Sequence, residues 1–209
     1  MRKTISTLLA TALMVGALAI PATASHRSYE GNFVDFIAEQ AEKPHGQFNI
    51  IGQVVLALAG AGVLTEDDVA ALGTAELTAF LPTDYAFRRL AADVSGEPAW
   101  KVKEADVIGI LTGALDLDTI GVVVKYHIYA GGKVGYWKAL RLDDNKRNGT
   151  DVYITMYSGG ELGIDRRGWL LQLDDAGTAG LGTNNPWVVW PNIKAGNAKV
   201  HGISEVLLP

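Results

Sequence analysis

The sequence predicts an α+β fold, and three observations support this prediction. Apolar residues recur at helical spacing up to about residue 120. Beyond that point, short apolar and aromatic segments alternate with glycine, asparagine and aspartate turn signals, which is typical of strands. The 209 residues include no cysteine, so packing rather than disulfide bonds must stabilise the folded chain. Because no internal repeat or linker divides these segments, we expect one domain over residues 25–209.

The N-terminus has the three parts of a signal peptide. Arg2 and Lys3 precede an uncharged apolar stretch over residues 8–20, and a Pro-Ala-Thr-Ala segment follows. That stretch is shorter than the ~20 residues that a membrane-spanning helix needs. We therefore interpret residues 1–24 as a signal peptide cleaved after Ala24, which predicts a secreted, extracellular or periplasmic protein without a transmembrane segment. A retained N-terminal anchor is the alternative.

Composition and charge exclude several classes of function. The formal net charge is −5, and cleavage would also remove Arg2 and Lys3, so no nucleic-acid partner held through phosphate contacts is expected. The absence of cysteine excludes thiol catalysis and cysteine-based metal sites. Nothing in the sequence indicates an oligomeric state.

Three helices are predicted in the first half of the chain. Apolar residues at helical spacing cover residues 33–41 and 50–58, and a Pro-His-Gly break at 44–46 separates the two segments. A third, short helix is predicted after Thr65, because a hydroxyl can cap free amides and three acidic residues follow it. Gly73 is expected to end that helix.

The second half of the chain predicts a mostly antiparallel sheet. Its segments are rich in β-branched and aromatic residues and are separated by combinations such as Ser-Gly-Gly, Asp-Ala-Gly and Asn-Asn-Pro that reverse the chain. The predicted strand segments are 121–132, 133–142, 151–157, 168–174, 186–193 and 199–208.

The segment TAFLPTDYAF predicts a strand that passes directly into a helix. Pro82 favours an extended conformation before it, Thr83 can cap the following helix, and Asp84 then lies in the first turn, where negative charge is favoured. Phe80 and Phe87 are expected in the core. Such junctions are common in unrelated folds, so the segment alone does not indicate a function.

Three segments together resemble the fasciclin domain family. They are TAFLPTDYAF, the Tyr-His pair in VKYHIYAGG, and NAKVHGISEVLLP at the C-terminal end, and they follow the family's order over about residues 33–209. The matching residues are Thr78, Phe80, Pro82, Thr83, Asp84, Phe87, Tyr126, His127, Asn197, His201, Leu207, Leu208 and Pro209.

The chain also departs from the family pattern. Leu81 replaces a small residue, and Gly202 and Ser204 replace the usual β-branched and acidic residues of the last segment. Residues 141–190 fit only as a series of strands, and the loop at 177–185 is longer than typical. Specificity peculiar to this protein is expected there.

The resemblance implies a fold and a class of function. The implied fold is a wedge-shaped β-sandwich covered by helices, with the first and last segments as neighbouring central strands. The implied function is adhesion at a cell surface or matrix, without catalysis and without a cofactor. In some family members the Tyr-His region binds a receptor, which makes Tyr126 and His127 candidate partner-binding residues here.

Other polar groups favour structural interpretations. His127 and His201 could form a metal or proton-transfer pair, but no carboxylate lies at a ligand-like spacing, so imidazoles bonded to backbone are favoured. Ser158 precedes two glycines rather than lying in a nucleophile elbow. The acidic-polar residues 143–151 lack the closing glutamate of a calcium loop and are interpreted as a hairpin tip; Asn148 there begins a glycosylation sequon.

Five aromatic residues of the strand-rich half are candidates for contact with a partner. Tyr136, Trp137, Trp169, Trp187 and Trp190 could stack on sugars or anchor a protein, although packing within strands is the favoured interpretation. The exceptions expected are Trp187 and Trp190. Their spacing of three places them on opposite faces of a regular strand, so both can face the core only if the strand contains a bulge.

These observations leave three hypotheses of function. The first is a secreted or cell-envelope interaction module that binds an extracellular protein or polysaccharide without catalysis. The second is a glycan-binding or small-ligand-binding protein, with processing included, that uses a cleft near the loops at 143–151 or 177–190. The third is a structural secreted domain whose surface binds nothing in particular.

Overall fold

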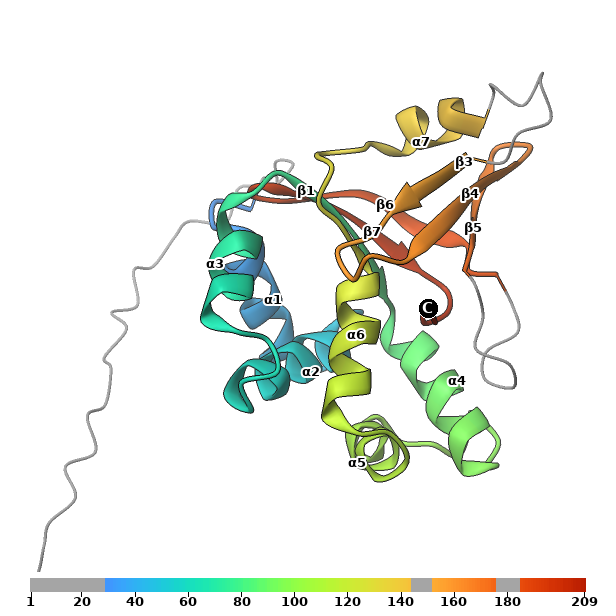
Figure 1. Cartoon of the computed structure of the whole chain (residues 1–209). Helices are drawn as coiled ribbons and strands as arrows, with labels where there is room; N and C mark the ends of the chain where they lie inside the picture. Colours follow the sequence, from blue (N-terminus) through green and yellow to red (C-terminus); the bar gives the residue numbers. More distant parts are fainter. Residues whose placement is uncertain (1–28, 144–151, 176–184) are drawn as a thin grey trace, which may run out of the picture.

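The computed structural model describes residues 29–143, 152–175 and 185–209 (Figure 1). The predicted signal peptide, the Asn148 sequon, most of the acidic-polar stretch and nearly all of the 177–185 loop lie outside these residues. The described residues form an α+β fold, as predicted. Its helices are α1 (Phe33–Ala41), α2 (Asn49–Gly60), α3 (Glu66–Thr74), α4 (Asp84–Ser95), α5 (Glu104–Ala114), α6 (Leu117–Tyr126) and α7 (Tyr136–Asp143).

The first three helices are those predicted from sequence. Asn32 and Asp35 form a capping box at the start of α1, and Thr65 and Asp68 form another at the start of α3. The predicted end of α3 is wrong, because Gly73 lies inside its last turn. The helix runs to Thr74 and ends where the backbone becomes extended. In the part of the chain that the structure describes, no single helix is long and apolar enough to cross a membrane; only the bent pair of α5 and α6 together passes that test.

The strands predicted at 121–132 and 133–142 are wrong. The first segment continues α6 up to Tyr126 and leaves only a two-residue strand, and the second forms α7. In α6, the Asp116 side chain accepts a hydrogen bond from the Thr119 amide and caps the helix, while Ile120 and Val124 are buried one turn apart. Capping and helical spacing therefore outweigh the β propensity of the valines.

Two sheets account for the strands of the described residues. The first has the order β2-β1-β7-β6, and the second has the order β3-β4-β5. The strands are β1 (Leu77–Pro82), β2 (Ile128–Tyr129), β3 (Val152–Thr155), β4 (Glu161–Arg167), β5 (Leu170–Asp174), β6 (Val188–Ala195) and β7 (Ala198–Ile203). β1 and β7 pair in parallel, so the first and last segments of the family pattern are neighbouring strands, as the resemblance implied; the other strand pairs are antiparallel.

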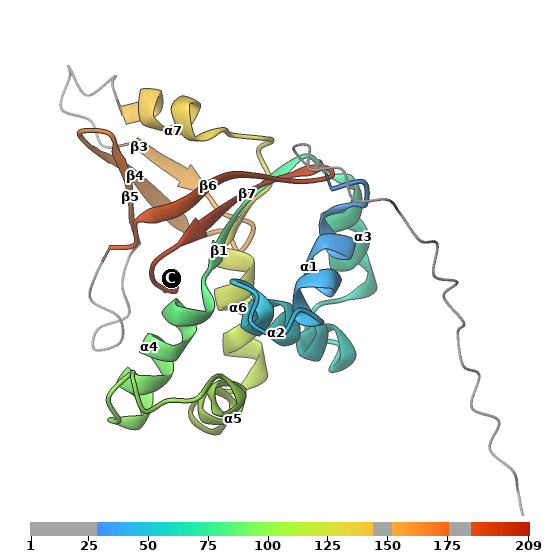
Figure 2. The ribbon, with the colours of Figure 1, turned by 180° about the vertical axis from the view of Figure 1, so that it is seen from behind.

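Two hydrophobic cores flank the first sheet. The helix-side core packs α1 to α6 against one face of this sheet and includes Phe36, Ile51, Leu58, Phe87 and Val107. The sheet-side core lies between the two sheets and α7 and includes Phe80, Leu162, Ile164, Leu171, Leu173 and Ile203. In both views the helices α1 to α6 lie on one side of β1 and β7, and β3, β4, β5 and α7 lie on the other (Figures 1 and 2).

Candidate interaction surface

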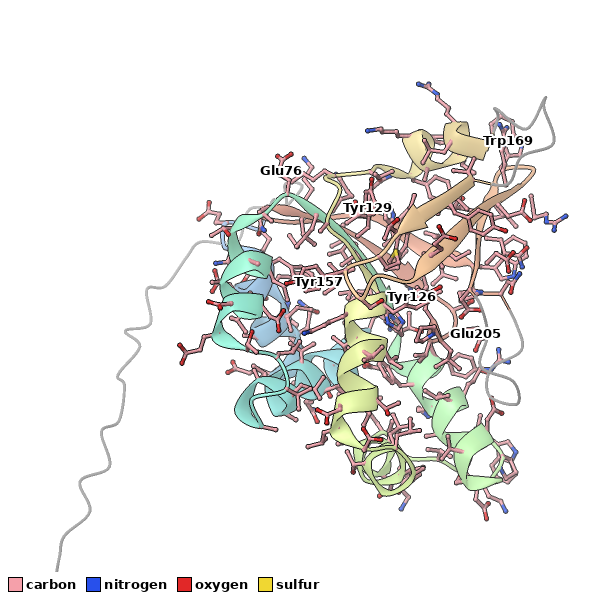
Figure 3. The ribbon with its side chains drawn as sticks, viewed as in Figure 1. Glu76, Tyr126, Tyr129, Tyr157, Trp169 and Glu205 are labelled. Carbon is pink, nitrogen blue, oxygen red and sulfur yellow. The ribbon has the colours of Figure 1, made fainter. Side chains whose placement is uncertain are left out.

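The turn between β4 and β5 places a tryptophan at the tip of a hairpin. Arg167 pairs with Leu170, so Gly168 and Trp169 form a two-residue turn. Gly168 has φ of 66°, a conformation that glycine adopts without strain and that suits the first turn position. Trp169 is therefore held away from the core, and 73% of its surface is exposed (Figure 3).

Helix α7 places a second tryptophan beside the first. Tyr136, Ala139 and Leu140 face the core, which turns Trp137 outward with 59% of its surface exposed. The rings of Trp137 and Trp169 meet edge to face, with centroids 6.4 Å apart and an interplanar angle of 79°. This geometry is the one that aromatic quadrupoles favour.

Tyr136 and Arg166 contact the two tryptophans and hold them in place. The Tyr136 hydroxyl donates a 2.8 Å hydrogen bond to the Trp169 carbonyl, and the Tyr136 ring packs edge to face on Trp137 at 5.7 Å. The Arg166 guanidinium lies 5.8 Å from the Trp169 ring centroid, within cation–π range. We call Tyr136, Trp137, Arg166 and Trp169 the aromatic patch. It offers two oriented aromatic surfaces that a sugar ring or an apolar side chain can contact.

Sequence reasoning underestimates the exposure of Trp137 and Trp169. It favours strand packing for both, because it predicts α7 as a strand and does not predict β4 at all. In β4 the alternation of apolar with other residues is limited to Leu162 and Ile164, and charged residues follow it. A prediction of β4 would have made Gly168-Trp169 a two-residue turn and placed Trp169 at its tip.

Trp187 and Trp190 are the predicted exceptions, and both lie in an irregular part of the chain around β6. The register between β6 and β7 shifts on either side of Trp190, and Asn192 has φ of 63°. Trp190 is 52% exposed, and Trp187 is half-buried. Neither side chain is fully buried, so the bulge does not serve to bury two tryptophans. The irregular backbone instead places Asn192 beside Tyr136. The Tyr136 amide donates a 2.9 Å hydrogen bond to the Asn192 side-chain oxygen.

The two departures in the last segment of the family pattern contact these tryptophans. A Cβ atom on Gly202 would lie 2.8 Å from the Cβ of Trp190, so glycine is needed where Trp190 crosses β7. The Ser204 hydroxyl accepts a 3.0 Å hydrogen bond from the Trp187 amide, and the Ser204 amide donates back to the Trp187 carbonyl. Gly202 therefore fits the Trp190 side chain, whereas Ser204 binds only the backbone of residue 187.

Asp84 has a structural role that sequence reasoning missed. Thr83 caps α4 as predicted, since its hydroxyl accepts from the Ala86 amide at 3.2 Å. The buried Asp84 carboxylate instead accepts from the amides of Ile50 at 2.9 Å and Asn49 at 3.2 Å, which are the first amides of α2. Helix α2 has no side-chain cap of its own, so Asp84 caps it from the neighbouring helix.

The remaining residues of the first pattern segment are also structural. The Thr78 hydroxyl donates to the Gly132 carbonyl and accepts from the Val134 amide, both at 2.8 Å. Phe80 lies in the sheet-side core and Phe87 in the helix-side core, as predicted for core residues. Pro82 is the last residue of β1 and is buried.

Asn197 connects three parts of the chain. Its side-chain oxygen accepts a 2.8 Å hydrogen bond from the Phe33 amide at the start of α1. Its side-chain nitrogen donates to the carbonyls of Leu72 and Ala75 at the end of α3. One side chain in the β6–β7 turn therefore satisfies free backbone groups of two helix ends.

Tyr126 and His127 are both buried, with 0% and 2% of their surfaces exposed. The Tyr126 hydroxyl donates to the Glu161 carbonyl at 2.5 Å. The Leu207 amide donates to Nε2 of His127 at 2.9 Å, so the proton of this imidazole lies on Nδ1, which donates to the Val123 carbonyl. Neither side chain reaches the surface in this conformation, and a partner therefore could contact them only after a rearrangement.

His127 and His201 are both bonded to backbone groups, as favoured from sequence, but through opposite tautomers. Burial lowers the pKa of His127 to about 4, with the hydrogen bond to Val123 opposing the shift, so this imidazole is neutral at pH 7. His201 stacks on Phe80 and has the opposite tautomer, because Nδ1 accepts from the Asn192 amide and Nε2 donates to the Val134 carbonyl. Burial also lowers its pKa. Backbone partners thus occupy all four ring nitrogens.

The C-terminal residues of the pattern close both cores. Leu207 lies in the sheet-side core, and Leu208 lies in the helix-side core. The Leu208 amide donates a 2.8 Å hydrogen bond to the Asp175 carboxylate. Pro209 is exposed.

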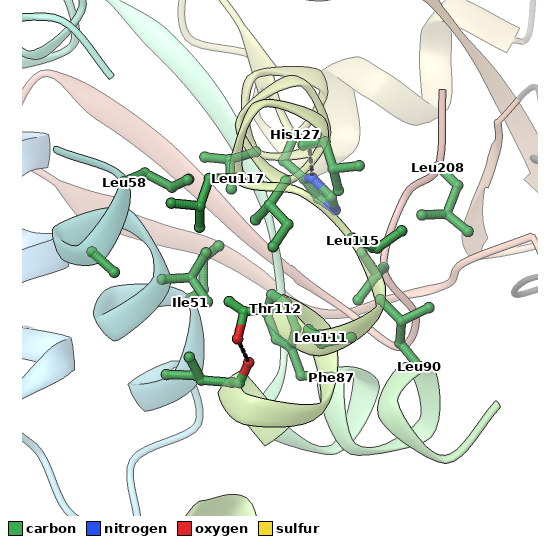
Figure 4. Close-up of a pocket in the computed structure, with 17 residues that line it drawn as sticks. Ile51, Leu58, Phe87, Leu90, Leu111, Thr112, Leu115, Leu117, His127 and Leu208 are labelled. Atoms are coloured by element: carbon green, nitrogen blue, oxygen red, sulfur yellow. Dashed lines mark hydrogen bonds between the residues drawn. The ribbon is translucent and has the colours of Figure 1, made fainter. Parts of the chain in front are cut away.

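An apolar pocket lies among α2, α4, α5, α6 and the C-terminal segment (Figure 4). It has a volume of about 40 Å³ and is lined by side chains such as Leu58, Phe87, Leu111 and Leu117. His127 borders it, but both of its ring nitrogens are hydrogen-bonded. Thr112 also lines the pocket, and its hydroxyl donates a 2.8 Å hydrogen bond to the Ile108 carbonyl, so these polar side chains are already bonded within the chain. Among the described residues, no group of three or more His, Cys, Asp and Glu side chains could hold a metal ion.

Comparison with known proteins identifies the fold. No family model matches the chain, and no curated protein matches its sequence. A solved structure of a FAS1 domain pair from the insect cell adhesion molecule fasciclin I matches with a TM-score of 0.55 and 11% sequence identity. The match covers 87% of this chain and 51% of that one, so this chain spans about half the length of the matched structure. The chain therefore has the FAS1, or fasciclin-type, fold.

Proposed function

We propose that this protein is a secreted or cell-envelope interaction module that binds an extracellular polysaccharide or protein, without catalysis, through the aromatic patch. The observation that carries the proposal is the exposure of Trp137 and Trp169 on an anchored framework. The two indoles are 59% and 73% exposed and lie against each other, so they form one contiguous apolar surface rather than isolated exposed side chains.

The fold supports the same class of function. The matched FAS1 domain pair comes from an insect cell adhesion molecule, and fasciclin-type folds are associated with adhesion. Fold alone does not determine function, so the proposal depends on the patch rather than on the match. Because the indoles are already oriented by Tyr136, little side-chain entropy is lost when a partner binds.

A binding screen tests the proposal. Residues 25–209 would be applied to a glycan array and to a panel of immobilised extracellular-matrix proteins, and we expect binding to at least one class. Binding should weaken when Trp137 and Trp169 are both replaced by alanine. Silence on both panels, or release of reducing sugar ends from a bound glycan, would overturn the proposal of a non-catalytic binding module.

A further inference from the structure

We propose that the aromatic patch and the basic residues of α7 together bind an acidic polysaccharide whose charges are carboxylates, such as a polymer of uronic acids. This inference rests on the proposed function, because it names the class of partner that the patch takes. The observation that carries it is the position of two arginines beside the exposed indoles, one on the β4–β5 hairpin and one on α7.

The hairpin turn holds Arg166 at the patch. Its Nε atom donates a 2.7 Å hydrogen bond to the Gly168 carbonyl, and its guanidinium carbon lies 5.8 Å from the Trp169 ring centroid. The backbone of the turn thus fixes a positive charge beside an exposed aromatic ring. Such a pair can contact an anionic group and a sugar ring of the same partner.

Helix α7 adds two more basic side chains. Arg141 follows Trp137 by four residues, so the two lie on the same side of the helix, and Lys138 is the residue after Trp137. Both basic side chains are exposed, and no ion pair between described residues involves either of them. A partner that reaches Trp137 therefore meets positive charge on α7 as well.

The carboxylate next to Arg166 in sequence faces away from the patch. Successive side chains of a strand point to opposite faces, so Arg166 lies on the same face of β4 as Ile164, which is part of the sheet-side core beneath α7. Asp165 and Arg167 lie on the other face, where their side chains pair at 2.7 Å. Neighbouring arginines of one strand thus have different surroundings, and Arg167 is a matched reference for Arg166.

This combination of groups favours a carboxylated sugar. Guanidinium groups bind carboxylates through two parallel hydrogen bonds, and indoles pack on the C–H faces of sugar rings. A uronic acid presents both features on one ring. The net charge of the chain is −5, which disfavours more densely charged polyanions such as sulfated glycans.

A peptide partner fits the patch less well. Recognition of an extended peptide by strand addition requires an exposed strand edge. The patch consists instead of side chains on a helix and at a two-residue turn. It therefore offers aromatic rings and charges, which suit a sugar polymer, without a row of backbone groups.

Titration with uronic-acid polymers tests the inference. The protein would be titrated with polygalacturonate, alginate and hyaluronan, and with each polymer after methyl esterification has removed its charge. We expect at least one acidic polymer to bind, and its methyl ester to bind at least about tenfold more weakly. Binding of the acidic polymer should also weaken when the salt concentration is raised from about 50 mM to about 500 mM, because salt screens exposed charges.

Three variants locate the charges that matter. Arg141→Gln and Arg166→Gln should each weaken binding of the acidic polymer by about tenfold and change binding of the methyl ester by less than about twofold. Arg167→Gln is the matched control, and its affinity should equal that of the wild type. Circular dichroism would show that each variant is folded. Because Arg141 lies outside the hairpin, Arg141→Gln tests the inference even if Arg166→Gln disturbs the turn.

The outcomes separate this inference from the proposed function. If neutral glycans, heparin or matrix proteins bind and no uronic-acid polymer does, the inference is overturned while the proposed function stands. The same holds if the methyl ester binds as tightly as the acidic polymer, or if Arg141→Gln binds the acidic polymer as tightly as the wild type. Silence of the glycan array, the matrix proteins and all of the polymers would overturn both.

Discussion

Asp84 belongs to a local sequence pattern but caps a helix that is distant in sequence. From sequence, its negative charge is expected to favour the start of α4, where it lies in the first turn. In the structure its carboxylate satisfies two amides of α2, which lies 34 and 35 residues earlier in the chain. Burial raises its pKa, while the two amide bonds oppose that shift and Glu104 adds to it. No local pattern could reveal this role, because the partner amides are distant in sequence.

Replacing Asp84 by alanine should destabilise the protein strongly. Two buried amides would lose their acceptor, and we expect the free energy of unfolding to fall by about 3 kcal/mol. Urea denaturation of the wild type and the variant measures this change. Asp67→Ala is the control, since Asp67 also lies in the first turn of a helix but is exposed. Equal effects of the two substitutions would show that Asp84 acts only through helix charge.

His127 should make the protein less stable in mild acid. Its pKa is about 4 in the folded protein, against 6.5 for a histidine exposed to water, so below pH 6.5 the unfolded chain binds more protons than the folded chain. Stability is thus present above pH 6.5 and is lost as the pH falls towards 4, by about 3 kcal/mol. His127→Gln should remove most of this loss in urea denaturation between pH 7 and 4. An unchanged pH dependence in that variant would contradict the role given to His127.

At the scale of elements, a helix is predicted where its cap and apolar spacing are clear, and it is missed where β-branched or aromatic residues suggest a strand. The capping boxes and apolar spacing of α1 and α3 are local signals, and both helices are predicted from them. Helix α6 is mistaken for a strand because its valines suggest β structure, whereas its cap at Asp116 and its buried stripe decide the outcome. β4 is missed because one of its inward positions is Arg166 and its centre contains Gly163.

The pairing of β6 and β7 provides a test at this scale. Gly202→Val restores the usual β-branched residue, but its side chain would meet Trp190 and Phe48 within 3 Å of the Cβ position. We expect a loss of about 2 kcal/mol in the free energy of unfolding. In a double-mutant cycle with Trp190→Ala, the combined loss should be clearly smaller than the sum of the single losses. Additive losses would mean that Trp190 does not determine the residue at 202.

At the scale of the whole molecule, the ordered sequence segments predict the fold, while the surface is harder to predict. The parallel pairing of β1 and β7 follows from the family resemblance. The aromatic patch joins a helix to a hairpin about 30 residues away, and the exposure of Trp190 accompanies the register shifts between β6 and β7. These features depend on tertiary placement, so the residue types alone indicate candidates without showing which tryptophans are exposed.

Asp68 connects the helical side of the molecule to the segment after β3. It accepts hydrogen bonds from Lys125 of α6 at 2.8 Å and from the Tyr157 hydroxyl at 2.9 Å, in addition to capping α3. Partial burial raises the pKa of Asp68, but hydrogen bonds from Lys125, Thr65 and Tyr157 outweigh that effect and bring it to about 2.

This connection should stabilise the fold in a second pH window. The folded-state pKa is lowered, so the stabilisation is present above pH 3.8 and is lost as the pH falls towards 2, by about 2 kcal/mol. Asp68→Asn should be less stable than the wild type at pH 6 and should approach it at pH 2 in thermal denaturation. A stability difference that stays constant from pH 6 to 2 would contradict the role of the carboxylate charge.

The central claim is that the aromatic patch binds the extracellular partner, and a ratio of two affinities tests it most directly. Trp100 is 76% exposed and lies in the α4–α5 connection, at the opposite end of the molecule from α7 (Figure 1). For the partner found in the screen, Kd would be measured for Trp137→Ala/Trp169→Ala and for Trp100→Ala. We predict that the first weakens binding by about a hundredfold and the second by less than about twofold. Equal affinities for the two variants would contradict the claim.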